Sequence, residues 1–204
     1  MLERERKEII HKYYKLFKPY GYISQLSSND ARQLRKKKFL KDLENVPSNI
    51  MPIGRLDEKS EGLLLLTTDG VYSDTVNRSG IEKEYVALLD GDIDDNAIEK
   101  LRNGVLIGIN GKKYQTKPCE VKKLTITPTL PTREKKIRDA RHGPVSWIKI
   151  VITEGKFRQI RKMTSGVGFP TLRLVRVRVG SIKLDDMQPG DVVECNNIEI
   201  KQPK

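Results

Sequence analysis

Pro52-Ile-Gly-Arg-Leu-Asp57-Glu-Lys-Ser-Glu-Gly-Leu-Leu-Leu-Leu-Thr-Thr-Asp-Gly70 is the stretch around which the chain is organised. Its apolar run, Leu63 to Leu66, lies between a glycine and a polar turn, and this pattern predicts a strand buried on both faces. A charged loop precedes the run, so a rigid strand would support Asp57 and aim its carboxylate at a ligand. Arg55 offers a planar donor fork for a phosphate or for that carboxylate. On the tetrapeptide Gly-Arg-Leu-Asp alone, a surface loop with a local Arg–Asp pair is the better interpretation.

The charge of the chain predicts an anionic partner. The 204 residues carry a net charge of +12, with a pI near 9.6. Residues 133–180 hold 13 Lys or Arg against 3 Asp or Glu, so most of the excess lies in one region. Such clustering favours a nucleic acid as the partner, with an anionic membrane surface as the second choice. No apolar segment approaches the ~20 residues that span a bilayer.

Cysteine and histidine usage argues against a disulfide framework or a zinc site. The two cysteines, Cys119 and Cys195, are far apart in sequence, and the two histidines, His11 and His142, form no ligand pattern with them. The N-terminus is charged in both signs and lacks the apolar core of a signal peptide. We therefore expect a cytoplasmic protein without a metal.

The whole stretch 52–70 resembles the catalytic motif of the ribosomal RNA pseudouridine synthases. That motif reads Gly-Arg-Leu-Asp, a short linker, Gly-Leu-Leu-Leu-Leu-Thr, one variable residue and Asp-Gly, and the chain carries each part in order. The resemblance implies that Asp57 is the catalytic aspartate. It also implies that Arg55 fills the space vacated by a flipped base, or holds the flipped nucleotide.

A second motif lies in Lys83-Glu-Tyr85-Val86, at the start of a predicted strand over residues 83–91. A tyrosine on a strand is ordinarily a core residue. The sequence is similar to the family's Lys-x-Tyr-x-Val element, however, whose aromatic ring stacks on the target base. The resemblance therefore implies a catalytic role for Tyr85 and substrate contact for Lys83.

A third motif spans residues 145–163, read as a strand, a Glu-Gly turn and a helix from Phe157 onward. Arg158, Arg161 and Lys162 would share one helix face, either as a phosphate-binding group or as a solvated basic face. The segment resembles the family's Glu-Gly-x-x-x-Gln-Ile/Val-Arg-Arg/Lys-Met motif. The resemblance implies that Arg161 forms a salt bridge with Asp57, while Arg158 and Lys162 bind RNA.

The closing motif lies in the predicted strand 168–180, which mixes apolar residues with arginines. It is similar to the family's Leu-x-Arg-x-x-x-Gly, read here as Leu174, Arg176 and Gly180. The resemblance implies that Leu174 lines the uracil pocket, and we assign Arg173 and Arg176 to RNA binding. Phe17-Lys18-Pro19-Tyr-Gly resembles the family's first motif, and we interpret its lysine and proline as structural.

The resemblance covers residues 13–194 and predicts an α+β fold. We expect a mixed, mostly antiparallel sheet flanked by helices, forming two lobes with Asp57 in the cleft. Residues 1–12 would be an N-terminal arm and residues 13–200 one catalytic domain without an S4 module. Local patterns add helices over about 31–45, 71–78 and 92–102, a hairpin over 105–114, a strand over 115–127 and a loop over 128–143.

Details of the motifs lie nearest the large-subunit synthase E branch of the RsuA-like group. The implied function is isomerisation of a specific uridine in large-subunit (23S) ribosomal RNA, by a monomer that needs no cofactor. Burial favours the neutral form of a carboxylic acid unless an opposite charge is close, and Arg161 offers that charge to Asp57. Attack on C1′ and removal of the C2′ proton stay open. A non-catalytic basic RNA-binding protein for ribosome assembly and a carboxylate N-glycosidase are the alternatives.

Overall fold

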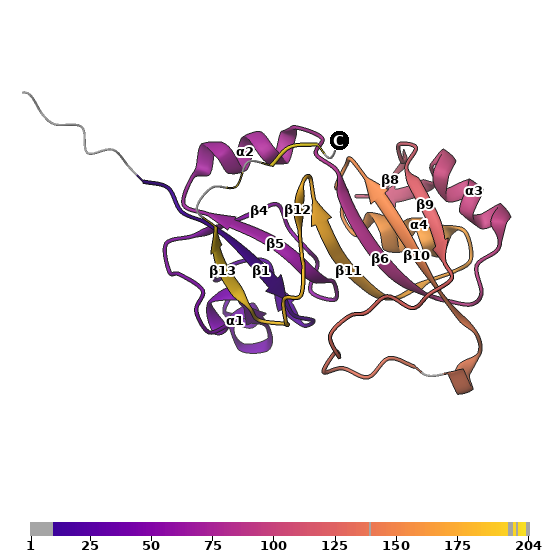
Figure 1. Ribbon diagram of the computed structural model, residues 1–204, viewed down its shortest axis with the longest axis horizontal. Coiled ribbons are helices and arrows are strands. Elements are labelled where there is room, and N and C mark those ends of the chain that lie inside the picture. Colours follow the sequence, from indigo (N-terminus) through magenta and orange to yellow (C-terminus); the bar gives the residue numbers. More distant parts are fainter. Residues whose placement is uncertain (1–9, 139, 196–197, 199, 203–204) are drawn as a thin grey trace, which may run out of the picture.

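The computed structural model describes residues 10–138, 140–195, 198 and 200–202. Most of the predicted arm 1–12 lies outside them. Within these residues nine strands form one sheet: β1 (Tyr13–Lys18), β4 (Met51–Ile53), β5 (Glu61–Thr67), β6 (Lys83–Asp90), β9 (Glu120–Leu124), β10 (Val145–Ile152), β11 (Thr171–Val179), β12 (Ile182–Lys183) and β13 (Val192–Cys195). The order is β13-β1-β5-β11-β6-β10-β9, with β4 beside β5 and β12 beside β11 (Figure 1). All these pairs are antiparallel except β5–β11, which confirms the predicted mixed, mostly antiparallel sheet.

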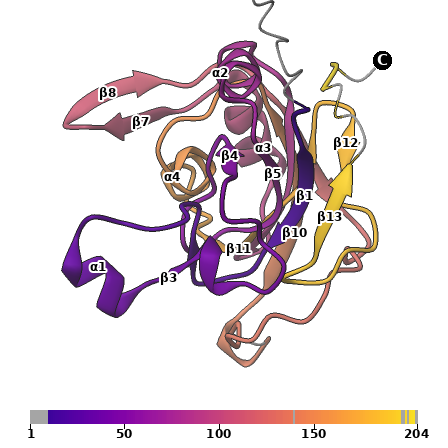
Figure 2. The ribbon, with the colours of Figure 1, turned by 90° about the vertical axis from the view of Figure 1, so that its left-hand side faces the viewer.

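The helices are α1 (Ala31–Lys36), α2 (Gly70–Arg78), α3 (Asp95–Asn103) and α4 (Gln159–Gly166), with 3₁₀ turns at Leu40–Asp42 and Ala140–His142. Two small pairs complete the described chain: β2 (Tyr22–Ile23) with β3 (Lys38–Phe39), and the hairpin β7 (Leu106–Ile109) with β8 (Lys112–Gln115). Figure 2 shows α1 and this hairpin projecting from the same side of the sheet, with α4 between them. No helix in these residues is long and apolar enough to cross a membrane.

Strand β5 is the centre of the core, as its apolar run predicts. All seven of its residues are buried. Leu63 and Leu65 pack on one face with residues of β11 and α2, whereas Leu64 and Leu66 pack on the other with residues of β1. The prediction of a strand buried on both faces is therefore confirmed.

The predicted helix over residues 31–45 is wrong in extent. Asp30 caps α1 by accepting from the backbone N–H groups of Arg32 and Gln33, but the helix ends after Lys36 and buries no residue. The backbone becomes extended at Lys37, and the side chains of Phe39 and Leu40 are buried in the core. Tertiary burial of these two side chains outweighs local helix propensity here. The predicted strand 115–127 shortens to β9, while helices α2 and α3 and the β7–β8 hairpin confirm their predictions.

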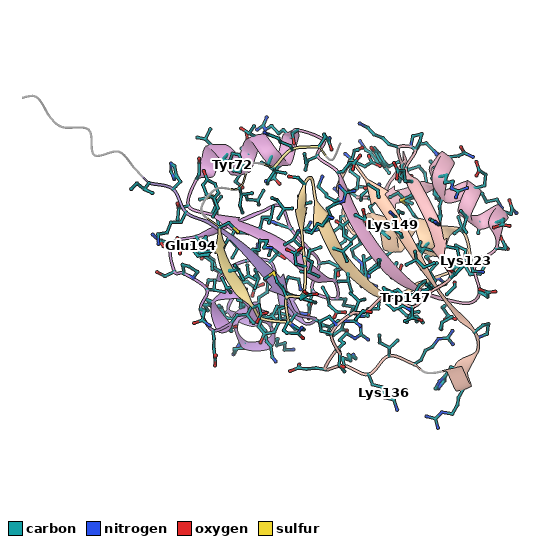
Figure 3. All side chains as sticks on the ribbon, viewed as in Figure 1. Tyr72, Lys123, Lys136, Trp147, Lys149 and Glu194 are labelled. Atoms are coloured by element: carbon teal, nitrogen blue, oxygen red, sulfur yellow. The ribbon has the colours of Figure 1, made fainter. Side chains whose placement is uncertain are left out.

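The segment between β9 and β10 forms the predicted irregular connection and extends below the sheet in Figure 1. Figure 3 shows Lys136 on it, away from the strands and from Trp147 on β10. Residues 131–133 of this segment contact both halves of the molecule: the Arg133 guanidinium lies 4.5 Å from the centroid of the Tyr20 ring, which follows β1, and the Pro131 carbonyl accepts from Arg173 Nη2 on β11 at 2.8 Å. These contacts anchor the segment across the two halves of the sheet.

The two halves of the sheet meet where β5 runs parallel to β11, over the register pairs Glu61–Val175 and Gly62–Arg176. Gly62 has φ +99°, and a Cβ at this position would lie 2.3 Å from the Arg176 carbonyl oxygen. Beside it, the buried Glu61 carboxylate accepts from Arg173 Nη2 at 2.9 Å and Nε at 3.1 Å. We call this junction, Glu61, Gly62, Arg173 and Arg176, the seam.

Substituting Gly62→Ala should destabilise the protein by about 3 kcal/mol or more. The change combines the ~1–2 kcal/mol cost of a positive φ with a backbone collision that no rotamer relieves. The matched control is Gly190→Ala, because Gly190 also has φ +99° but open space around its Cβ position. Urea unfolding should give the control a loss of only about 1–2 kcal/mol. Equal losses in the two variants would contradict the close approach at the seam.

Lys18 ends β1 with a fully buried side chain, directly beside Gly62 in the register. Its Nζ donates to the carbonyls of Pro19 at 2.8 Å and Tyr22 at 2.7 Å. Burial lowers the Lys18 pKa from 10.5 to about 7, against the opposing attraction of Asp57 and nearby glutamates. The buried side chain fits the structural role predicted for Lys18, and its amino group gains or loses a proton near neutral pH.

The buried Lys18 should make stability depend on pH. Between pH 7 and 10.5 the unfolded chain keeps the proton that folded Lys18 has lost, so the free energy of unfolding rises with pH in this window. The variant Lys18→Met lacks this titration. The wild-type free energy minus that of the variant should therefore rise from pH 7 to 10, by up to about 1.4 kcal/mol per pH unit.

Chemical denaturation at several pH values measures this difference, and a flat or falling difference would contradict the lowered pKa. Should the variant fail to fold, nitrogen-15 NMR of the wild-type lysine Nζ gives the same titration directly.

Candidate active site

Asp57 lies in a tight turn that leads into β5 and fixes both of its carboxylate oxygens. Oδ1 accepts from the backbone N–H of Lys59 at 2.9 Å, and Oδ2 accepts from Ser60 Oγ at 2.9 Å. The preceding residue, Leu56, is held by Ser24, whose hydroxyl donates to the Leu56 carbonyl at 2.8 Å and accepts from its N–H. The carboxylate, 17% exposed, is therefore positioned by the fold before any ligand arrives.

Two arginines from the other half of the molecule face this carboxylate. Arg158 Nη1 lies 3.4 Å from Oδ1, and Arg161 Nε lies 3.5 Å from Oδ2 of Asp57. Arg161 also donates to the carbonyls of Lys59 at 2.7 Å and Thr171 at 3.1 Å, so it ties the Asp57 turn to the start of β11. Burial lowers the Arg161 pKa, and the attraction of Asp57 opposes that effect. The structure thus brings together the aspartate and the arginine that the motifs pair.

The turn before α4 is built by the Glu and Gln of the third motif. The Glu154 carboxylate accepts from Gln159 Nε2 at 2.6 Å, from Tyr114 Oη at 2.6 Å and from the backbone of Lys117 at 2.9 Å. Gln159 Oε1 in turn accepts from the N–H of Lys156 at 2.9 Å. The predicted helix start at Phe157 is wrong, because Arg158 has φ +53° and α4 begins at Gln159. The left-handed backbone at Arg158 brings its guanidinium to the same carboxylate as Arg161, one turn further along.

A cavity of about 590 Å³ opens beside Asp57. Its apolar lining includes buried side chains from the turn before β5 and from β6, β10, α4 and β11: Leu56, Tyr85, Ile152, Ile160 and Leu174. Its polar lining includes Arg55, Asp57, Glu58 and Arg158. The cavity combines an apolar slot with a carboxylate held between guanidiniums, so it suits a flat, partly apolar ring attached to a polar or anionic group.

Four residues predicted to contact substrate point elsewhere. Lys83 Nζ donates to the Ile81 carbonyl at 2.7 Å, and burial followed by repulsion from Arg176 lowers its pKa to about 8. Lys162 Nζ donates to the Gly108 carbonyl of the β7–β8 hairpin at 2.7 Å. Arg173 is buried against Glu61, and Arg176, also buried, donates to the Leu63 carbonyl at 2.7 Å. All four hydrogen bonds end on protein groups, so a direct RNA contact by any of them stays a prediction that these bonds do not favour.

The sequence interpretation missed the residues that hold Asp57, the turn before α4 and the β5–β11 junction in place. Ser60 follows Asp57 by three positions, a spacing at which a serine hydroxyl commonly bonds an aspartate in a turn, so this signal was available. Gln159 stands inside the third motif, but its bond to Glu154 depends on the left-handed residue between them. The Glu61–Arg173 pair joins positions 112 residues apart and had no local signal.

The described residues contain no group of three His, Cys, Asp or Glu side chains that could hold a metal ion. The Asp57 carboxylate lies between two arginine guanidiniums and beside the apolar slot of the cavity. Such a carboxylate can attack an electrophilic carbon or remove a proton from a ligand in the slot.

Comparisons with known proteins agree with this geometry. Residues 12–166 match the family model described as RNA pseudouridylate synthase. The ribosomal large subunit pseudouridine synthase E of Xanthomonas campestris pv. campestris is 40% identical over 177 residues, 86% of this chain and 90% of that protein. The protein of the same name in Vibrio parahaemolyticus is 40% identical over 85% of this chain and 69% of its own. The ribosomal large subunit pseudouridine synthase B of Bacillus subtilis is 30% identical over 98% of this chain and 74% of its own.

Solved structures give the same fold. A pseudouridylate synthase crystal structure is similar with a TM-score of 0.70 and 25% identity, covering 91% of this chain and 70% of that one. Human RNA pseudouridylate synthase domain containing 1 shares the fold with a TM-score of 0.54 at 15% identity, covering 96% of this chain and 81% of that one. The family model spans most of the chain and the E-type relatives match nearly all of it, so the chain belongs to the RNA pseudouridylate synthase family.

Proposed function

We propose that this protein isomerises a specific uridine in large-subunit ribosomal RNA to pseudouridine, with Asp57 as the catalytic residue. The observation that carries the proposal is the Asp57 carboxylate, 3.4 and 3.5 Å from two arginines, at a cavity that Tyr85 and Leu174 line. The relatives at 40% identity bear a large-subunit name, which supports the choice of RNA. The net charge of +12 supports a polyanionic substrate.

We assign residues at the cavity their roles in the reaction from their positions. Asp57 attacks C1′ of the nucleotide or removes its C2′ proton, and the bond from C1′ to uracil N1 breaks. The uracil then turns and bonds to C1′ through C5, the carboxylate leaves C1′ or C2′ regains its proton, and the C5 hydrogen passes to solvent. Arg161 pairs with the carboxylate. Tyr85 stacks on the uracil and Leu174 packs against it. Extruding the base costs a few kcal/mol, which stacking at ~1–3 kcal/mol and phosphate contacts offset. Arg55 is exposed at the cavity, in a position to contact the RNA backbone or the space left by the base.

The variant Asp57→Asn tests the catalytic role of the carboxylate. Release of tritium from ribosomal RNA labelled with [5-³H]uridine should occur with the wild type and fall by roughly a thousandfold or more in this variant, since the reacting oxygen pair is lost. The matched control is Glu58→Gln, because Glu58 is the neighbouring carboxylate in the same cavity but is paired with Lys37 at 2.6 Å. The control should keep activity within about tenfold of the wild type.

Other outcomes of this assay point to other functions. Equal release by the wild type and Asp57→Asn would contradict the catalytic role. No release by any form, with RNA binding intact on substrates from several assembly stages, would favour a non-catalytic RNA-binding protein of ribosome assembly. Free uracil in the products would identify an N-glycosidase, with Glu58 as the second acid in the cavity.

The variant Arg161→Met tests the pairing of Arg161 with Asp57, because it keeps the bulk of the side chain but removes the charge nearest Asp57 Oδ2. Arg161 also holds the Asp57 turn through the Lys59 carbonyl, so its loss should misplace the carboxylate and lower kcat/KM for tritium release by roughly a hundredfold. Arg158→Met is the matched control and should lose less activity, because Arg158 is 34% exposed and Arg161 only 10%. Wild-type activity in a folded Arg161→Met variant would contradict the pairing.

The proposal includes action as a monomer in the cytoplasm, away from membranes. A single chain supplies every residue assigned a role above, which supports the monomer. Light scattering at the concentration of the activity assay tests the oligomeric state, and cell fractionation tests the location.

A further inference from the structure

Phe157 is exposed over 67% of its surface, although it adjoins Arg158, which pairs with Asp57, and lines the same cavity as that carboxylate. Large apolar side chains at a functional cavity are commonly covered when a ligand binds. The neighbouring Arg158 points to Asp57, whereas Phe157 lies at the outer edge of the lining, on the turn between β10 and α4. Neither the chemistry at Asp57 nor the packing of the core uses this ring.

The backbone that carries Phe157 is fixed, so the exposure is not that of a loose loop. Glu154 and Gln159 bracket the turn and bond each other at 2.6 Å, and Gln159 also bonds the N–H of Lys156. Arg158, the next residue, is held by its ion pair with Asp57. A ring presented on such a support loses little conformational entropy when it stacks on a ligand, which favours binding.

One cation lies over the ring, and most of the ring surface is still exposed. This cation is Lys162 Nζ, 5.1 Å from the ring centroid, and it is itself held by its bond to Gly108. An exposed aromatic ring beside a fixed ammonium group is a combination with which proteins hold single-stranded nucleic acid, because bases stack on the ring and phosphates meet the charge.

We propose that Phe157 is the stacking platform for a base that directly adjoins the target uridine, in a subsite at the rim of the cavity. This inference rests on the proposed function, which places the target base in the slot between Tyr85 and Leu174. Phe157 lines the same cavity as that slot, so a nucleotide adjoining the target can reach its ring. The subsite therefore selects RNA whose neighbouring base can unstack, and it acts on binding rather than on the bond changes at Asp57.

The test uses a synthetic RNA that contains the mapped target uridine, and a second set with an abasic site at the 5′ or the 3′ neighbour. Phe157→Ala should raise KM for tritium release about tenfold on intact RNA, as expected for the loss of one stacked base, with kcat within about twofold of the wild type. On the abasic RNA that lacks the base stacked on Phe157, the variant and the wild type should have the same KM, because there is no stacking to lose. Phe157→Tyr should restore the wild-type value, whereas Phe157→Leu should not.

Val71→Ala is the control, since Val71 is 80% exposed on α2 and does not line the cavity; it should behave as the wild type. The subsite is ruled out if Phe157→Ala matches the wild type on intact RNA, if its defect persists on both abasic RNAs, or if Phe157→Leu restores KM. An inactive wild type would overturn the proposed function instead. In that case fluorescence anisotropy with the same RNAs still tests stacking, with the same pattern expected in Kd.

Discussion

The close parallel contact at the seam is the constraint on which the rest of the molecule depends. β5 and β11 share only two register pairs, yet they join the half of the sheet that carries Asp57 to the half that carries its arginines. Gly62 permits the approach, and the buried Glu61–Arg173 pair fixes it. Such a pair contributes little net stability by itself, but losing one partner leaves an uncompensated buried charge that costs about 3–5 kcal/mol. The seam therefore favours one alignment of the two halves.

The alignment at the seam decides the electrostatics of the site. Asp57 lies four residues before Glu61, so a shift of β5 along β11 would carry the carboxylate away from Arg161. Lys18 and Arg176 are buried close by, and their positive charges meet backbone carbonyls as well as the nearby carboxylates. Several charged side chains are thus taken out of water in one small region. Regions that depart in this way from an apolar core are where function is expected.

Sequence patterns were sufficient where the determining interactions are local. The run Leu63–Leu66 predicted its own strand, and the spacing in the third motif, through its resemblance, paired Arg161 with Asp57. They failed where distant residues decide the outcome. The helix over residues 31–45 ends early because Phe39 and Leu40 are buried, and Leu40 packs against residues of β1 and β5.

The arginines of β11 show the same limit. RNA binding by Arg173 and Arg176 stays a prediction, but their sequence did not indicate their place in the seam, because their partners Glu61 and Leu63 come from β5. A buried arginine and a phosphate-binding one have the same sequence signature, and only the position of the partner separates them. The account therefore assigns RNA contact at the cavity to Arg55 and to the rim around Phe157, where side chains are exposed.

The central claim is that this arrangement converts one uridine of the large-subunit RNA through Asp57. A nucleotide-resolution map of pseudouridine tests it most directly, in ribosomal RNA from a host that lacks its own enzyme of this kind and expresses either the wild type or Asp57→Asn. The account predicts one additional pseudouridine in the large-subunit RNA with the wild type and none with the variant. A map unchanged by the wild type, or an additional site that persists with Asp57→Asn, would contradict it.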